Sequence, residues 1–306
     1  MNRNEHLHLL AERSELQRIL AGIPEEDRLT RGSFAARLED VEEQLASTPP
    51  PVRSPARARL TFRGRPVIGH HGVFAEFGTK ATNAFADTVA KVAAALSGPL
   101  SPMGPIPNRE ESQLLITSTA VGSFGFELEE YRPSGQLDFG EESVAGQALE
   151  MTKSLLQSTV GTDDELADSA AGTDPRAVEA LRTFLDLLAA NEAICLLEHE
   201  KKVFRFRDVG EVRRAVERLG QDNLREEQTH LAGEFQGVLP KGRTFEFKLA
   251  DTGEVVRGKV GPAIADPDVI NRHLHQATTI DVLATRVGNG RPRYVLTAVP
   301  GWQEGE

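Results

Sequence analysis

Two pairs of histidines are the residues of this chain best suited to hold a metal or move a proton. His70 and His71 stand between Gly69 and Gly72, with Glu76 a few residues on. Adjacent side chains of a strand point to opposite faces, and a metal site generally needs a third and a fourth ligand. No HExxH motif is present. We therefore expect a glycine turn with one histidine partly buried and hydrogen-bonded, and no metal.

The second pair is His273 and His275. On a strand these two side chains would share a face and could chelate a metal, whereas at a helix end they would diverge. The neighbours Asn271 and Arg272 are equally compatible with a capped turn. We expect a structural role here, and metal binding by either histidine pair is the alternative.

A basic segment near the C-terminus is the main candidate for binding. Three arginines and a tyrosine surround a Gly-Asn-Gly turn, and small barrels often contact nucleic acid through such loops. The competing interpretation is a hairpin whose arginines pair with Asp281, Glu246 or a similar carboxylate, and contact with a protein is a third. The candidate binding residues are Arg286, Asn289, Arg291, Arg293 and Tyr294.

Neither candidate nucleophile has the surroundings that catalysis requires. Cys195 lies in the apolar run AICLL, which predicts a buried packing residue. Ser123 directly follows Gly122, a spacing that differs from G-x-S-x-G, and no motif supplies a positioned histidine and acid. The glycine-rich patterns GxxxxGK[ST] and GxGxxG are absent. We expect no catalytic residue and no cofactor, with a hydrolase of unfamiliar type as an alternative.

Composition indicates a soluble protein. The chain has 306 residues, 39% of them hydrophobic, and a single cysteine, which excludes an internal disulfide and suits a reducing cytoplasm. No apolar run approaches the roughly 18 residues of a membrane span, and the N-terminal sequence does not resemble a signal peptide. The net charge of −11 argues against a generic affinity for nucleic acid.

The N-terminal residues 1–47 are predicted to form an acidic helical hairpin. They hold 6 Lys and Arg against 10 Asp and Glu, and Ser33 is the expected N-cap of the second helix. The hairpin would either pack on its own body or dock on a partner. Its apolar residues recur with helical spacing at Leu9, Leu16 and Ile23 and then at Phe34, Leu38, Val41 and Leu45.

A proline-rich linker, residues 48–57, separates this hairpin from a central α+β domain of residues 58–225. Apolar periodicity and turn signals divide that domain into alternating elements. Its predicted strands cover 59–67, 114–121, 122–129, 194–197 and 203–206, and its predicted helices cover 79–96, 141–158, 174–190 and 209–219.

Residues 229–306 carry equal numbers of basic and acidic side chains, 9 of each, and change in character. Five short strand candidates are separated by glycine turns and by a segment with helical potential at 266–274. This pattern predicts a small barrel of the SH3-like or OB-like kind. The whole chain is therefore expected to be α+β.

The stretches VGSFGFELEE and GRTFEFKLADTGEVVRGKV resemble segments of multidomain bacterial proteins, which implies an intracellular bacterial protein. Our first functional hypothesis is a non-enzymatic regulator, antitoxin-like or part of a defence system, that binds another protein through the acidic hairpin. A nucleic-acid-binding module that uses the Arg286–Tyr294 hairpin is the alternative. No membrane contact is expected, and a homo-oligomer is left open.

Overall fold

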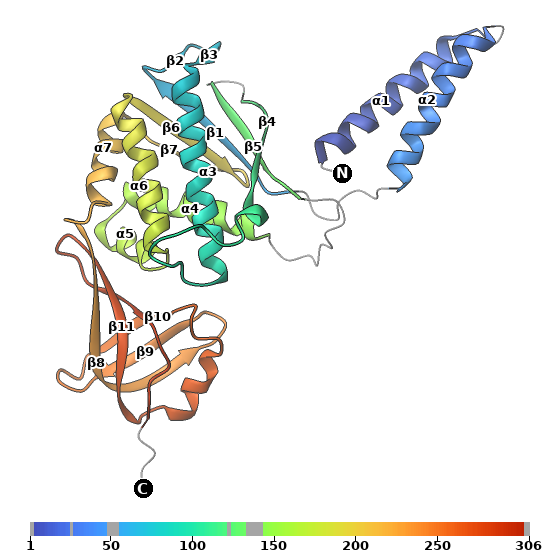
Figure 1. Cartoon of the computed structure of the whole chain (residues 1–306). Helices are drawn as coiled ribbons and strands as arrows, with labels where there is room; N and C mark the ends of the chain where they lie inside the picture. The colour runs from blue at the N-terminus through green and yellow to red at the C-terminus, as the bar shows by residue number, and fades with distance from the viewer. Residues whose placement is uncertain (1–2, 25–26, 48–54, 121–123, 133–142, 303–306) are drawn as a thin grey trace.

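The computed structural model describes residues 3–24, 27–47, 55–120, 124–132 and 143–302. An N-terminal helical pair precedes a sheet covered by helices, and a closed barrel follows (Figure 1). The α+β class and the small C-terminal barrel are confirmed. The proline run of the predicted linker lies largely outside the described residues.

The N-terminal helices are α1 (Arg3–Gly22) and α2 (Arg28–Ser47), which pair side by side (Figure 1). The predicted helical hairpin is therefore confirmed. The apolar stripes meet in a narrow core, where the first three of the following residues are buried and the rest are partly buried: Leu9, Leu16, Val41, Phe34, Leu38 and Leu45.

The N-cap predicted for the second helix is wrong. The helix α2 begins at Arg28, so Ser33 lies inside it and donates its hydroxyl hydrogen bond to the Thr30 carbonyl at 3.1 Å. The cap is Asp27, whose carboxylate accepts a hydrogen bond from the Thr30 amide at 3.2 Å. Aspartate is as good an N-cap as serine, and this one comes first in the chain.

A five-stranded antiparallel sheet forms the middle of the central domain, in the order β4-β5-β1-β6-β7. Alternate residues of β1 and β6 point into the core, as Leu60, Phe62, Cys195 and Leu197 do. A small hairpin, β2 (Val67–Ile68) with β3 (Gly72–Val73), follows the first strand. The sheet strands are β1 (Arg57–Gly64), β4 (Leu114–Thr119), β5 (Phe124–Glu130), β6 (Ala193–His199) and β7 (Lys202–Arg205).

Helices cover this sheet and enclose the larger core (Figure 1). Phe85 and Phe184, from two helices that pack together, meet edge to face with their ring centroids 5.7 Å apart. Asp174 caps the helix that begins at Pro175, and its side chain accepts a hydrogen bond from the Arg176 amide, whereas one short acidic helix was not predicted. The helices are α3 (Ala75–Ser97), α4 (Val144–Thr159), α5 (Asp163–Ala170), α6 (Pro175–Ala190), α7 (Val209–Arg218) and the 3-10 turn Arg109–Ser112.

Gly125 on β5 occupies a position where a side chain would not fit. A Cβ atom at this position would lie 2.1 Å from the Leu60 carbonyl oxygen of the neighbouring strand. The absence of a side chain here thus lets the backbones of β5 and β1 approach closely. Gly122 and Ser123, the poor match to a nucleophile elbow, lie outside the described residues.

The C-terminal strands close into a barrel in the order β10-β12-β11-β8-β9. Its core is aromatic, with the Phe235 ring 5.9 Å from that of Phe245 and 5.0 Å from that of Phe247. All five predicted strands are present. They are β8 (Leu224–Leu239), β9 (Thr244–Leu249), β10 (Val255–Val260), β11 (Ala277–Val287) and β12 (Arg293–Leu296), with the 3-10 helix Pro267–His273 before β11.

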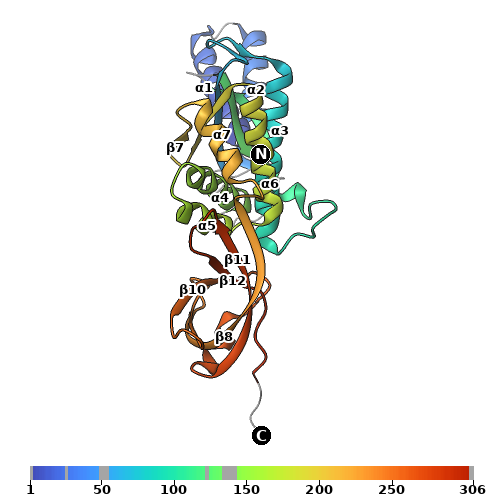
Figure 2. The same ribbon diagram turned by 90° about the vertical axis from the view of Figure 1, so that its left-hand side faces the viewer.

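Two long strands join the barrel to the central domain (Figure 2). The strand β11 pairs along its whole length with the first part of β8, from Ala277 opposite Glu234 to Val287 opposite Leu224. At the end of this ladder Val287 is buried in the larger core and Leu224 packs against it. The predicted boundary between residues 225 and 229 therefore falls within a strand that continues from one core into the other.

Candidate binding surfaces

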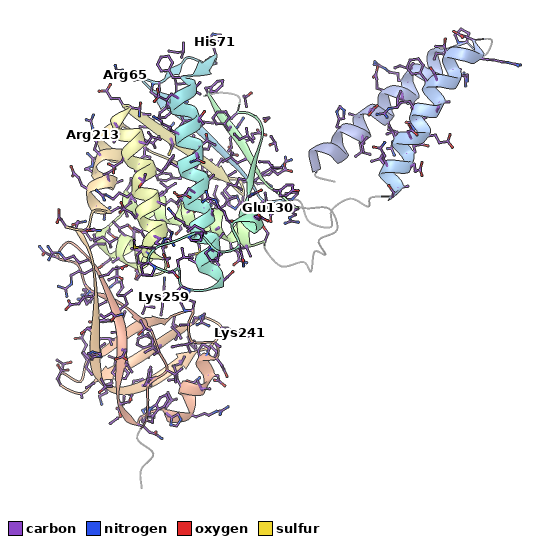
Figure 3. All side chains as sticks on the ribbon, viewed as in Figure 1. Arg65, His71, Glu130, Arg213, Lys241 and Lys259 are labelled. Carbon is purple, nitrogen blue, oxygen red and sulfur yellow. The ribbon has the colours of Figure 1, made fainter. Side chains whose placement is uncertain are left out.

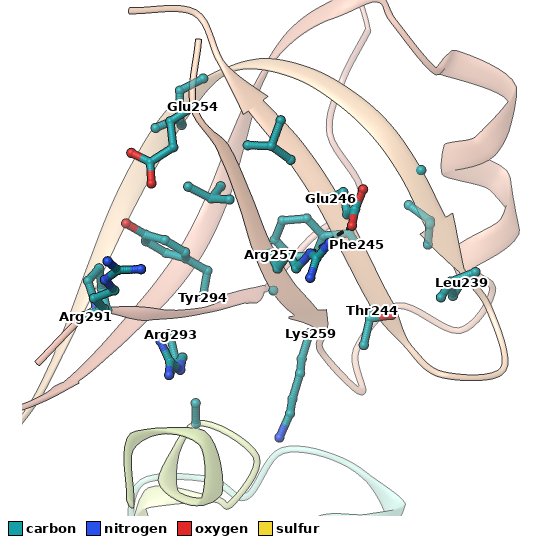
Figure 4. A pocket seen from close by; sticks show the side chains of 18 of the residues that line it. Leu239, Thr244, Phe245, Glu246, Glu254, Arg257, Lys259, Arg291, Arg293 and Tyr294 are labelled. Atoms are coloured by element: carbon teal, nitrogen blue, oxygen red, sulfur yellow. Dashed lines mark hydrogen bonds and ion pairs between the residues drawn. The ribbon is translucent and has the colours of Figure 1, made fainter. Parts of the chain in front are cut away.

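A cavity of about 1180 Å³ lies on the barrel and borders α5 (Figure 4). Three predicted binding residues, Arg291, Arg293 and Tyr294, line it, whereas Arg286 and Asn289 do not. Its lining combines cationic, aromatic and acidic side chains. The other lining residues of these kinds are Lys259, Arg257, Phe245, Glu246, Glu254 and Asp168.

Strand pairing brings these side chains together. The strand β12 runs parallel to β10, with Tyr294 opposite Gly258, and β10 runs antiparallel to β9, with Gly258 opposite Phe245. A Cβ atom at Gly258 would lie 2.5 Å from the Phe245 ring. The glycine therefore lets the aromatic ring lie across the strand at the cavity.

Arg293 and Lys259 point from the barrel toward α5 (Figure 4). The Arg293 guanidinium lies 2.5 Å from the Asp168 carboxylate and 3.3 Å from that of Asp164. The Lys259 ammonium donates a hydrogen bond to the Asp168 carbonyl at 3.1 Å. Burial lowers the pKa of Lys259, and the Asp168 charge opposes this shift. Two cations of the cavity are thus engaged within the protein.

The expected pairing of basic and acidic side chains is present, but with other partners. Asp281 lies 2.5 Å from the His230 ring, and Glu246 pairs with Arg257 at 2.8 Å. Neither carboxylate contacts the arginines for which it was proposed. The acidic partners of Arg293 lie instead on α5, a helix that the sequence did not reveal.

The helix α5 is held firmly at its acidic N-terminus. Thr162 and Glu165 form a reciprocal capping box, and the backbone hydrogen bond from Thr162 lowers the pKa of Glu165. Arg218 at the end of α7 contacts the Asp163 carboxylate at 2.8 Å and the Thr159 carbonyl at 2.6 Å. Cations from both domains therefore surround one short helix.

Arg286 and Arg291 remain exposed. Among the residues that the structure describes, neither of them forms an ion pair. Tyr294 is half-buried, and burial raises its pKa while the Arg286 charge opposes this effect. Of the three arginines in the predicted binding segment, an external ligand could therefore reach these two without breaking an ion pair.

The structure places His70 and His71 in the turn between β2 and β3, as predicted. The His71 amide donates a hydrogen bond to the Ile68 carbonyl at 3.0 Å. The expectation that one ring is partly buried is wrong, because both residues are exposed on a protruding hairpin (Figure 3). Glu76 lies on α3 and pairs with Lys80 at 2.7 Å.

His273 and His275 also lie in a turn, at the end of the 3-10 helix. The His273 ring stacks on the Trp302 ring with centroids 4.0 Å apart, and its Nδ1 lies 3.1 Å from the Gln276 side-chain oxygen. His275 has a positive φ of 61° and is exposed. These contacts agree with the predicted structural role.

Cys195 is buried in the core of the sheet, as predicted. Burial raises the pKa of its thiol to about 12. Because the thiolate is the nucleophilic form, we expect this buried cysteine to be unreactive at neutral pH.

Among the described acidic side chains of the N-terminal hairpin, all but the half-buried Glu12 are exposed. Arg37 pairs with Glu12 at 2.7 Å across the two helices. Along α2, a short run of carboxylates is exposed and forms what we call the acidic row: Glu39, Asp40, Glu42 and Glu43.

One cluster of residues that could bind a metal ion was not predicted from the sequence. Glu150, on α4, lies beside His199 and Glu200, at the end of β6 and the turn after it. No spacing along the chain indicates this group. The only available signal was the alternation of β6, which places His199 on the same buried face as Cys195 and Leu197.

Within the described part of the chain, no helix is long and apolar enough to cross a membrane. Comparison with known proteins provides no match, since no family model, curated protein or solved structure is significantly similar to the chain.

Proposed function

We propose that this protein is a non-enzymatic interaction protein of the bacterial cytoplasm, which binds a basic surface of another protein through its N-terminal hairpin. The observation that carries the proposal is the acidic row of α2, whose carboxylates are all exposed. Such a row complements a basic surface and speeds association by electrostatic attraction.

The small core of the hairpin supports docking. Only Leu9, Leu16 and Val41 are buried among its described residues, while Phe34 and Leu38 are partly buried. Helices of this length gain most of their stability from packing an apolar face. A partner that covers Phe34 and Leu38 would bury more of their apolar surface and so stabilise the hairpin.

The chemistry of the acidic row also suggests the class of partner. Enzymes that process nucleic acid carry basic surfaces that bind phosphates. An acidic hairpin that covers such a surface would inhibit the enzyme, which is the action expected of an antitoxin-like or defence-system regulator.

The experiment compares three forms of the tagged full-length chain in affinity isolations from bacterial lysate at about 0.15 M salt. The test variant neutralises the acidic row with Glu39→Gln, Asp40→Asn, Glu42→Gln and Glu43→Gln. The control variant makes the same change in net charge at exposed positions elsewhere, with Glu76→Gln, Glu179→Gln, Asp222→Asn and Glu227→Gln.

We expect a specific protein that the wild type and the control recover, and that the test variant loses. The isolated partner should then bind the purified wild type with an affinity that falls as salt rises. Equal recovery by the test variant would contradict the proposal.

The second candidate function is nucleic-acid binding, favoured by one observation: Arg291 and Tyr294 line a single cavity with Lys259. Stacking on an aromatic ring beside cationic groups is the usual way to bind a single strand. Against this, Arg293 is already paired and the net charge is −11.

Titration of full-length protein with single- and double-stranded DNA and RNA separates the two candidates. For a nucleic-acid binder, the slope of log affinity against log salt should fall by about one for each phosphate-contacting arginine removed. We expect no binding tighter than nonspecific levels. A submicromolar, salt-sensitive affinity that Arg286→Gln, Arg291→Gln and Arg293→Gln abolish together would replace the first proposal.

A further inference from the structure

Three residues from two elements bring potential metal ligands together in the central domain. Glu150, His199 and Glu200 each offer one ligand atom, and these atoms lie within 4.8 Å of one another. The helix α4, which carries Glu150, contacts both β6 and β7. Convergence of an imidazole and two carboxylates is the donor set of many divalent transition-metal sites.

The hydrogen bond of His199 fixes which ring nitrogen can bind a metal. Its Nδ1 lies 2.7 Å from the Arg57 carbonyl oxygen. Because a carbonyl oxygen only accepts hydrogen bonds, Nδ1 carries the proton and Nε2 carries the lone pair. Metal-binding histidines are usually oriented by a bond of this kind on the second nitrogen.

The lone pair on Nε2 of His199 accepts no hydrogen bond within the described structure. The residue is only 2% exposed, and its Nε2 is buried without a hydrogen-bond partner among the described residues. A buried acceptor that stays unpaired is unfavourable. A metal ion between the imidazole and the two carboxylates would satisfy it.

We propose that Glu150, His199 and Glu200 form a binding site for a divalent first-row transition metal, with Zn²⁺ as the representative ion. Imidazole favours such ions over Mg²⁺ and Ca²⁺, which prefer oxygen ligands alone. Glu200 is exposed in the two-residue turn between β6 and β7, so solvent reaches the site. Three protein ligands leave a coordination position for water.

Two lysines compete with the metal for Glu150. Lys202 lies 3.2 Å from one carboxylate oxygen of Glu150, and Lys153 contacts the other. The Lys202 side chain is 65% exposed and can turn into solvent, whereas Lys153 is buried. The metal therefore takes the oxygen that Lys202 holds, and Lys153 keeps its own partner.

This competition provides a sharp test by calorimetric titration of the full-length protein with Zn²⁺. Wild type should bind one equivalent. His199→Gln and Glu200→Gln should each weaken binding about tenfold or more, whereas Lys202→Gln should tighten it. Glu198→Gln is the matched control, because Glu198 precedes His199 on β6, points to the opposite face and lies 3.8 Å from Arg59.

One further variant tests whether the binding is specific to this site. The double change His70→Asn and His71→Asn should leave the affinity unchanged, since those rings lie in another turn. If His199→Gln fails to fold, Glu200→Gln still decides, because the exposed side chain of Glu200 adds little to packing. Absence of saturable binding, or equal affinity in wild type and Glu200→Gln, would overturn the proposal.

Discussion

Arg293 on β12 and Asp168 on α5 place a guanidinium nitrogen 2.5 Å from a carboxylate oxygen, and so join the barrel to the central domain. A second carboxylate, that of Asp164, lies 3.3 Å from the same guanidinium. This contact is accompanied by the continuous strands β8 and β11, which extend from one core into the other. The two domains are therefore connected both by an ion pair and by two continuous strands.

Arg293→Gln should reduce the free energy of unfolding by about 1 kcal/mol, because surface ion pairs reach that value when one cation serves two carboxylates. Urea denaturation followed by Trp302 fluorescence gives the measurement, since this single tryptophan lies against the barrel core. The matched control is Arg257→Gln. Arg257 pairs only within the barrel and is 82% exposed, so its loss should have a smaller effect.

A double-mutant cycle with Asp168→Asn isolates the pair itself. The combined variant should be more stable than the sum of the two single changes predicts, because each single change already breaks the contact. Additive effects would show that Arg293 and Asp168 do not interact in solution.

Leu38→Asp should unfold the N-terminal hairpin while the barrel stays folded. Leu38 packs against the small core around Val41, and its partial burial contributes about 1–2 kcal/mol. Circular dichroism should lose helical signal, while the Trp302 fluorescence melt stays unchanged. Ala35→Asp adds the same charge at an exposed position of α2 and should keep the helical signal. A simultaneous loss of both signals would show that the hairpin and the barrel unfold as one unit.

Joint replacement of His70 and His71 by asparagine should leave both the thermal midpoint and the metal content unchanged. Both side chains are exposed, and the turn is closed by the backbone hydrogen bond from the His71 amide to the Ile68 carbonyl. Differential scanning calorimetry and elemental analysis provide the measurements. One tightly bound zinc or manganese ion per chain that disappears in this variant would assign the metal to this turn.

Cys195 should resist thiol reagents as long as the chain is folded. With a pKa of about 12, its thiol ionises far less at pH 8 than a free cysteine of pKa about 8.5. A chromogenic disulfide should react fast only after denaturant is added. Since folding raises this pKa, the stability that the protonated thiol contributes is present below about pH 8.5 and declines as the pH rises toward 12. Rapid reaction of the native protein would show that the sheet core opens.

The elements with a clear apolar period were predictable from the sequence, and those held by tertiary contacts were not. The long stripe of α3 and the aromatic strand β9 carry their patterns locally. The helix α5 is short and acidic, and its capping box was the one signal available for it. The first half of β8 is polar and exposed, so only its pairing with β11 makes it a strand.

The candidate sites were likewise predictable only where their residues are close together in the sequence. Arg291, Arg293 and Tyr294 are close in sequence, and their shared cavity follows from one hairpin. The partners of Arg293 come from a distant helix, so the sequence indicated that a carboxylate would pair with it but not which one. The group around His199 depends on how α4 crosses the sheet, which no local pattern encodes.

The closed order of the barrel restricts how any polypeptide can be recognised there. Each of its five strands has a neighbour on both sides, so the closed part of the barrel offers no open edge, whereas Leu224–Leu231 of β8 pairs with β11 alone. A peptide could therefore join this sheet as an additional strand only along that extension, outside the closed part. Ligands that bind the closed part must be recognised by its side chains.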